Sequence, residues 1–126
     1  MSKAETHELE LALRDHQIGF VLNPGEQIIG HLRLQRGALI HGYVHGSVEC
    51  AQGSVIITET GCVLGDISAD RVLVEGAIKS NPNQPKHQVI GKHLISISSV
   101  ASVDADLASK AFALHSTSIQ GALKTL

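Results

Sequence analysis

The chain has 126 residues, a formal net charge of −2, and a composition that is 43% hydrophobic but only 2% aromatic. The 10 Lys and Arg residues are scattered rather than gathered into a patch with aromatic side chains, so we expect no nucleic-acid partner. No apolar run approaches the roughly 18 residues needed to cross a bilayer, and an enclosed ligand pocket normally uses more aromatic rings. We therefore expect one domain with an aliphatic core.

Residues 1–16 form a polar lead-in to the rest of the chain. Their charged character does not fit a signal peptide, and it leads us to expect no membrane association. Leu9, Leu11 and Leu13 alternate as in a strand, while Leu9 and Leu13 also fit one face of a helix, so the periodicity leaves both structures open. A turn is predicted at 23–26, where Asn-Pro-Gly-Glu separates two apolar stretches.

A pattern of apolar, any, small, any and apolar residues returns along the rest of the chain. Its small central residues are Gly30, Gly46, Gly65, Ala105 and Gly121. They lie 16 positions apart from Gly30 to Gly46, 19 from Gly46 to Gly65, and 16 from Ala105 to Gly121. Alternation of period two puts one set of side chains inside a sheet and the other outside. Its return at a near-constant longer spacing is typical of a β-solenoid, in which each coil stacks on the one before.

The alternation is nearly continuous over 27–79, stops in a stretch with two prolines, and then runs to the C-terminus. We expect a loop insertion over about 81–93. The predicted fold class is all-β: a single-stranded β-helix domain over 17–126 with roughly six coils, about 29 Å long at about 4.8 Å per coil. The positions expected to point into its core include Val44, Val63 and Ile78.

The histidines do not form a metal-binding pattern. His41, His45 and Glu49 are spaced by four and are expected to share the outward face. Four residues of strand span about 13 Å, which is too far for one metal ion with ligands near 2 Å. We therefore expect solvated histidines and predict no metal, no cofactor and no catalytic residue.

Three further polar residues are expected to have structural roles. Asp66 follows a glycine in a corner-like setting, where its carboxylate is expected to accept hydrogen bonds from local backbone amides. Cys50 and Cys62 form neither a metal motif nor a disulfide framework. We expect both cysteines to be reduced thiols that are mostly packed.

Two stretches resemble the bactofilin family of bacterial polymer-forming cytoskeletal proteins. They are Ile-His-Gly-Tyr-Val-His-Gly-Ser-Val at 40–48 and Gly-Cys-Val-Leu-Gly-Asp-Ile at 61–67. The resemblance covers 27–80 and continues more weakly after residue 93. It implies a right-handed β-helix of triangular cross-section that assembles end to end into non-polar filaments without a bound nucleotide.

The expected assembly surface is the C-terminal end of the solenoid, because an uncapped coil exposes core side chains and unpaired backbone groups that recruit another chain. The residues predicted to form it are Phe112, Ile119, Leu123 and Leu126. We therefore predict a cytoplasmic, bacterial scaffold that binds copies of itself, with other scaffold or cell-envelope proteins as further partners. Two alternatives stay open: a β-helix adaptor that does not polymerise, and a metal-dependent enzyme like those with hexapeptide repeats.

Overall fold

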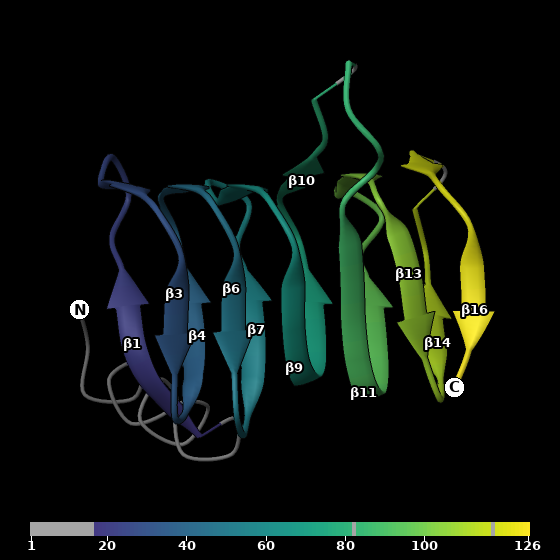
Figure 1. Cartoon of the computed structure of the whole chain (residues 1–126), viewed down its shortest axis with the longest axis horizontal. Coiled ribbons are helices and arrows are strands. Elements are labelled where there is room, and N and C mark those ends of the chain that lie inside the picture. Colours follow the sequence, from purple (N-terminus) through teal and green to yellow (C-terminus); the bar gives the residue numbers. More distant parts are fainter. Residues whose placement is uncertain (1–16, 82, 117) are drawn as a thin grey trace.

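The computed structural model describes residues 17–81, 83–116 and 118–126, and its regular elements within these ranges are all strands. The strand or helix considered for residues 1–16 lies outside the described residues. Every strand pairing is parallel. Figure 1 shows the strands side by side along the long axis of the molecule, from the N-terminal to the C-terminal end. The predicted all-β solenoid of about six coils is confirmed.

The coils pass in turn through three sheet faces, and each face contains one strand segment from each coil. Face 1 consists of β1 (Ile18–Leu22), β4 (Gly37–Ile40), β7 (Ser54–Ile57), the second halves of β9 (Ile67–Val74) and β11 (Gln88–Ile97), and β14 (Phe112–Leu114). Face 2 consists of β2 (Gln27–Ile29), β5 (Tyr43–His45), β8 (Cys62–Leu64), β10 (Ala77–Lys79), β12 (Ser102–Asp104) and β15 (Ile119–Gln120). Face 3 consists of β3 (Leu32–Leu34), β6 (Val48–Cys50), the first halves of β9 and β11, β13 (Asp106–Ser109) and β16 (Leu123–Thr125).

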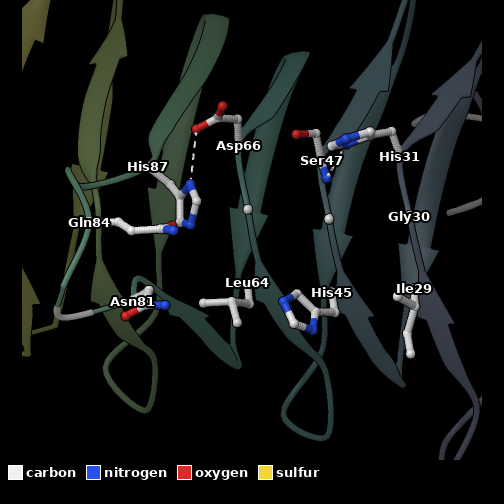
Figure 2. A pocket seen from close by; sticks show the side chains of 12 residues that line it. Ile29, Gly30, His31, His45, Ser47, Leu64, Asp66, Asn81, Gln84 and His87 are labelled. Carbon is white, nitrogen blue, oxygen red and sulfur yellow. Dashed lines mark hydrogen bonds and ion pairs between the residues drawn. The ribbon is translucent and has the colours of Figure 1, made fainter.

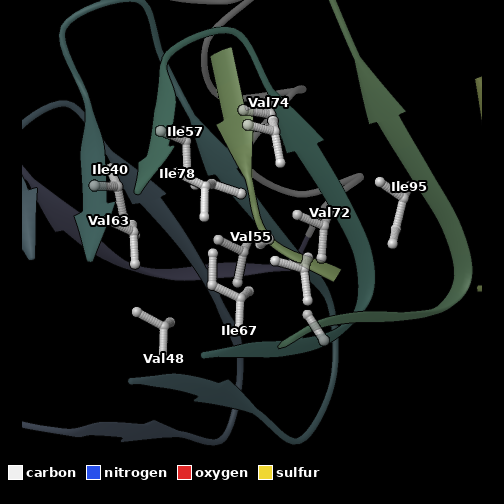
Figure 3. Packing of buried hydrophobic residues seen from close by; sticks show 14 of the residues in the cluster. Ile40, Val48, Val55, Ile57, Val63, Ile67, Val72, Val74, Ile78 and Ile95 are labelled. Carbon is white, nitrogen blue, oxygen red and sulfur yellow. The ribbon is translucent and has the colours of Figure 1, made fainter. Parts of the chain in front are cut away.

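Inward-pointing residues align into columns, because parallel pairing in register places equivalent positions of successive coils side by side. The column under face 2 contains Ile28, Val44, Val63, Ile78, Val103 and Ile119. Its four inner members are at most 1% exposed, which confirms the predicted burial of Val44, Val63 and Ile78. All the side chains labelled in Figure 3 are Val or Ile, and they fill the space between the faces. Burying each such side chain stabilises the fold by about 1.5–3 kcal/mol.

The loop between β10 and β11 is shorter than predicted. Strand structure ends at Lys79 and resumes at Gln88, although we expected it to resume only near residue 93. The pairing of β11 with β9 is irregular between Gly91 and Leu94, where β11 bends from face 3 to face 1. Two exposed residues at that bend interrupt the alternation. The sequence pattern therefore does not predict the short strand segment around the buried Val89.

The corner between faces 2 and 3 is built from closely packed backbone. Gly46 has a φ of 153°, and a Cβ there would overlap the carbonyl oxygen of Gly30 in the preceding coil. A Cβ on Gly65 would in turn overlap the carbonyl oxygen of Gly46. Only glycine allows this approach without displacing backbone. The returning small residue of the sequence pattern therefore marks one corner of the stack.

Candidate self-assembly ends

The stack of coils has two terminal coils, and each pairs with a neighbour on one side only in the part of the chain that the structure describes. The first coil contains β1, β2 and β3, and the last contains β14, β15 and β16. Their outer edges leave a row of backbone N–H and C=O groups without a strand partner among the described residues. Such an edge is a template for another strand. Figure 1 shows the two edges at opposite ends of the molecule.

One core column begins and ends with the two phenylalanines of the chain. From the first coil to the last it contains Phe20, Ala38, Val55, Val72, Ile95 and Phe112. The four inner members are 0% exposed, whereas the two phenylalanines are only partly buried and pack against the core cluster. Each terminal coil thus presents a large apolar ring at the position where a further coil would continue the column.

The structure places all four predicted assembly residues in or just after the last coil. Leu123 pairs with Leu107 of the fifth coil, but Leu107 is 1% exposed and Leu123 is 52% exposed. Phe112 and Ile119 are partly buried against the core, and Leu126 is 53% exposed. Phe112, Ile119 and Leu123 therefore continue buried core columns, and no coil of the described residues covers them on their outer side.

The first coil presents a second apolar end, which the sequence analysis did not single out. Phe20, Ile28 and Leu32 occupy the same three columns as the predicted residues of the last coil, and they are partly buried against the core. A stack leaves its first coil with one neighbour, as it does its last. The onset of alternation around the turn at 23–26 is the signal that could have located this end.

The residues considered as metal ligands are separated by the corners of the coil. His41 Nδ1 lies 2.9 Å from Thr58 Oγ1 at the corner between faces 1 and 2, whereas His45 lies exposed on face 2. Glu49 lies on face 3, where its carboxylate is 3.5 Å from Arg33 Nε. The expectation that these side chains share one outward face is therefore wrong. No group of three or more His, Cys, Asp or Glu within the described ranges could hold a metal ion.

Carboxylates at the corner between faces 2 and 3 connect successive coils. The backbone N–H of Gln88 donates to Asp66 Oδ1 at 2.8 Å, and that of Ala122 donates to Asp106 Oδ1 at 2.9 Å. The expectation of a local partner for Asp66 is therefore wrong, since its partner lies 22 positions away and in the next coil. The role of the carboxylate is structural, but the stack determines which amide it reaches.

A groove of about 490 Å³ runs along the outside of the same corner. Ile29, His45 and Leu64 come from successive coils and line its face 2 side, and the loop between β10 and β11 borders it (Figure 2). His87 of that loop has its Nδ1 3.4 Å from Asp66 Oδ1, which holds the loop beside the groove. The groove offers apolar and imidazole surface on the side of the rod.

Both cysteines are free thiols. Burial raises the pKa of the Cys50 thiol from 9.0 to about 11, and the nearby Glu49 carboxylate adds to the increase. Burial also raises the pKa of Cys62, against the opposing charge of Lys79. Because the thiolate is the nucleophile, both side chains are poorly reactive near neutral pH.

The fold and its two ends define a class of protein: a β-solenoid whose core columns stop at apolar terminal coils, each with an outer edge that pairs with no other strand among the described residues. A family model described as "Bactofilin: Polymer-forming cytoskeletal" matches residues 20–124. The chain therefore belongs to the bactofilin family, and the resemblance carried by 40–48 and 61–67 is confirmed. No curated protein and no solved structure gives a significant match. Within the described ranges, no helix has the length and apolar character to cross a membrane.

Proposed function

We propose that this chain is a bacterial cytoskeletal scaffold that joins end to end through its terminal coils into polymers that need no bound nucleotide. Membership of a polymer-forming cytoskeletal family supports self-association. The end-to-end arrangement is supported most directly by the change in exposure along one column, from 1% at Leu107 to 52% at Leu123. Leu123 continues a core column into the last described coil, and a further coil stacked on it would remove its side chain from the surface.

Contact between two ends would stabilise a terminal coil in two ways. It would cover apolar side chains such as Phe112 and Ile119, and complete burial of side chains of this size contributes about 1.5–3 kcal/mol each. It would also place a strand beside the backbone edge that has no strand partner among the described residues. Apolar burial and backbone pairing already hold neighbouring coils together inside the molecule. Assembly would therefore extend the interactions of the fold.

Introducing a positive charge into the end surface tests this arrangement. Leu123→Arg puts a cation where two ends would meet, while Val100→Arg makes the same kind of change on a corner of the fifth coil, where the side chain is 64% exposed. In negative-stain electron microscopy with light scattering, we expect filaments or sheets for the unmodified protein and for Val100→Arg. For Leu123→Arg we expect discrete particles, because a buried interface charge without a partner is costly. Polymers of equal length from both variants, or discrete particles from the unmodified protein, would contradict end-to-end assembly.

Nucleotide independence is tested on the same preparations. After nucleotides are removed enzymatically, the polymer mass recovered by sedimentation should be the same with and without added ATP or GTP. A requirement for either nucleotide would overturn this part of the proposal while leaving the end contacts in place.

We propose a cytoplasmic location, with the outer sides of the rod available to other scaffold or cell-envelope proteins. The family is a structural one, and we propose no catalytic role. A fluorescent fusion of the full chain should give discrete cytoplasmic structures that disperse when Leu123→Arg is introduced, whereas dispersal by Val100→Arg would point to a different surface.

A further inference from the structure

The loop over 80–87 contacts the coils on both sides of its own. It leaves the fourth coil between β10 and β11. On one side, His87 Nδ1 lies 3.4 Å from Asp66 Oδ1 in the third coil (Figure 2). On the other side, Ser80 Oγ donates to the carbonyl oxygen of Asp104 in the fifth coil at 2.6 Å. The loop is therefore attached to the coil before its own and to the coil after it.

Lys86 extends these contacts to the last coil. Its ammonium group forms an ion pair with the Asp104 carboxylate and donates to the carbonyl oxygen of Gln120 at 3.2 Å. Asp104 and Gln120 are register partners on β12 and β15, and β12 separates β10 from β15 in the sheet. Repeats of a solenoid generally contact only their neighbours. One side chain from the fourth coil thus joins the fifth coil to the sixth.

Hydrogen bonds within the loop fix its shape. The N–H of His87 donates to Ser80 Oγ at 3.2 Å, which closes the base of the loop. The N–H groups of Asn83 and Gln84 donate to the side-chain and backbone oxygens of Asn81, each at 3.1 Å. Asparagine stabilises turns through such local bonds. A braced loop holds its ammonium group near the two oxygen partners at a lower cost in conformational entropy.

The last coil is lightly attached to the stack where Lys86 reaches it. β15 contains only two residues, and β16 is exposed along its whole length. Among the described residues, this coil pairs with a neighbour on one side only. Segments with few neighbours and exposed hydrogen bonds open most easily. A contact on β15 therefore acts where strand pairing alone holds the coil by few bonds.

We propose that the loop over 80–87 is a strap that holds the last coil on the stack, and that Lys86 positions this coil for assembly. The proposal rests on the end-to-end assembly proposed above. Phe112, Ile119 and Leu123 form one end surface only while the last coil is closed. Because an open coil does not present that surface, the apparent affinity between ends falls with the fraction of molecules in which the coil is closed.

Two lysine substitutions of the full chain separate the strap from a simple loss of charge. Lys86→Met removes the ammonium group and keeps a long, flexible side chain. Lys92→Met is the matched control, because it removes the same charge from the exposed bend of β11. Lys86→Arg is the conservative variant, since a guanidinium group also pairs with a carboxylate and donates to a carbonyl oxygen. The Lys86 and Asp104 side chains are each 40% exposed, so these variants should keep the fold.

Hydrogen exchange measured by mass spectrometry tests whether the strap holds the last coil. The N–H groups of Val103, Ala105 and Leu107 donate to carbonyl oxygens of that coil, so their exchange reports its opening. Below the critical concentration for assembly, we expect exchange over 102–108 to be about fivefold faster in Lys86→Met than in the unmodified protein. Lys92→Met and Lys86→Arg should match the unmodified protein. Equal exchange in the two methionine variants would overturn the strap.

The critical concentration for polymer formation, measured by sedimentation, tests the positioning role. It should rise about threefold or more in Lys86→Met and stay unchanged in Lys92→Met and Lys86→Arg, because only the first variant lowers the fraction of closed coils. Faster exchange in Lys86→Met with an unchanged critical concentration would overturn the positioning role.

The two measurements distinguish failure of the strap from failure of end-to-end assembly. If the unmodified protein forms no polymer, end-to-end assembly is contradicted and the positioning role falls with it. The exchange measurement is made on single molecules, so it would still decide whether the loop holds the last coil. Polymers from the unmodified protein together with equal exchange in the two methionine variants would overturn the strap and leave end-to-end assembly in place.

Discussion

Ile78 and Ile119 offer a direct test of the stacking interactions, because they occupy one core column in different coils. Ile78 lies in the fourth coil, is 1% exposed and has a neighbouring coil on each side. Ile119 lies in the last coil, pairs only with Val103 among the described residues, and is partly buried. The same substitution at the two positions therefore differs mainly in whether a second coil covers the side chain.

The expected losses of stability follow from this difference. Shortening a fully buried isoleucine to valine costs about 1 kcal/mol and shortening it to alanine about 2–5 kcal/mol, the larger part of the spread being the cavity that remains. We expect Ile78→Ala to fall in that range. At Ile119 the side chain is covered on one side and solvent can fill the space, so we expect less than about half the loss seen at Ile78.

Urea unfolding followed by far-UV circular dichroism measures both losses, since the chain has no tryptophan. The variants are made in the Leu123→Arg background so that assembly does not cover Ile119. The denaturant slope should remain unchanged, which shows that the midpoint reports stability. Equal losses at the two positions, or a loss below about 1 kcal/mol for Ile78→Ala, would refute the view that coil-on-coil burial stabilises the rod.

Two further predictions concern the corner and a buried thiol. Gly65→Ala should lower the free energy of unfolding by about 2 kcal/mol or more, because its Cβ would overlap the backbone carbonyl oxygen of Gly46; an unchanged melting temperature would contradict the close backbone packing. Since the pKa of Cys50 is about 11 in the folded protein and 9.0 is its ordinary value, the unfolded chain loses the thiol proton first as the pH rises. The stability of the unmodified protein relative to Cys50→Ala should therefore fall between about pH 9 and pH 11, by at most about 3 kcal/mol, and parallel pH profiles would contradict the burial of the thiol.

The inner surface of the solenoid could be predicted from sequence because period-two alternation separates inside from outside locally. The alternation predicts that Val44, Val63 and Ile78 point into the core, and all three are buried. The return of the pattern every 16 to 19 residues gave the number of coils to a good approximation. Both signals depend on residues close together in the chain, which is where sequence patterns are informative.

Features that depend on contacts between coils could not be predicted in the same way. The amide that binds Asp66 belongs to Gln88, and only the register of the stack brings the two together. The strand segment before Gly91 was missed because β11 bends there and its alternation is interrupted. The pairing of Phe20 and Phe112 as the two ends of one column likewise needs the register of all the intervening strands.

The core columns connect the stability of one molecule with its assembly. An inner residue such as Val63 is covered by coils of its own chain, so a disruptive change there removes the folded rod and with it any polymer. A residue such as Leu123 has the same inward orientation, but among the described residues a coil covers it on one side only. A substitution there should therefore change the folding stability of the isolated molecule little and weaken the contact between molecules most. Along each column the effect of a substitution should therefore shift from folding to assembly as the position approaches an end. That shift is expected only if polymer contacts continue the core, because a lateral interface would depend on outward residues instead.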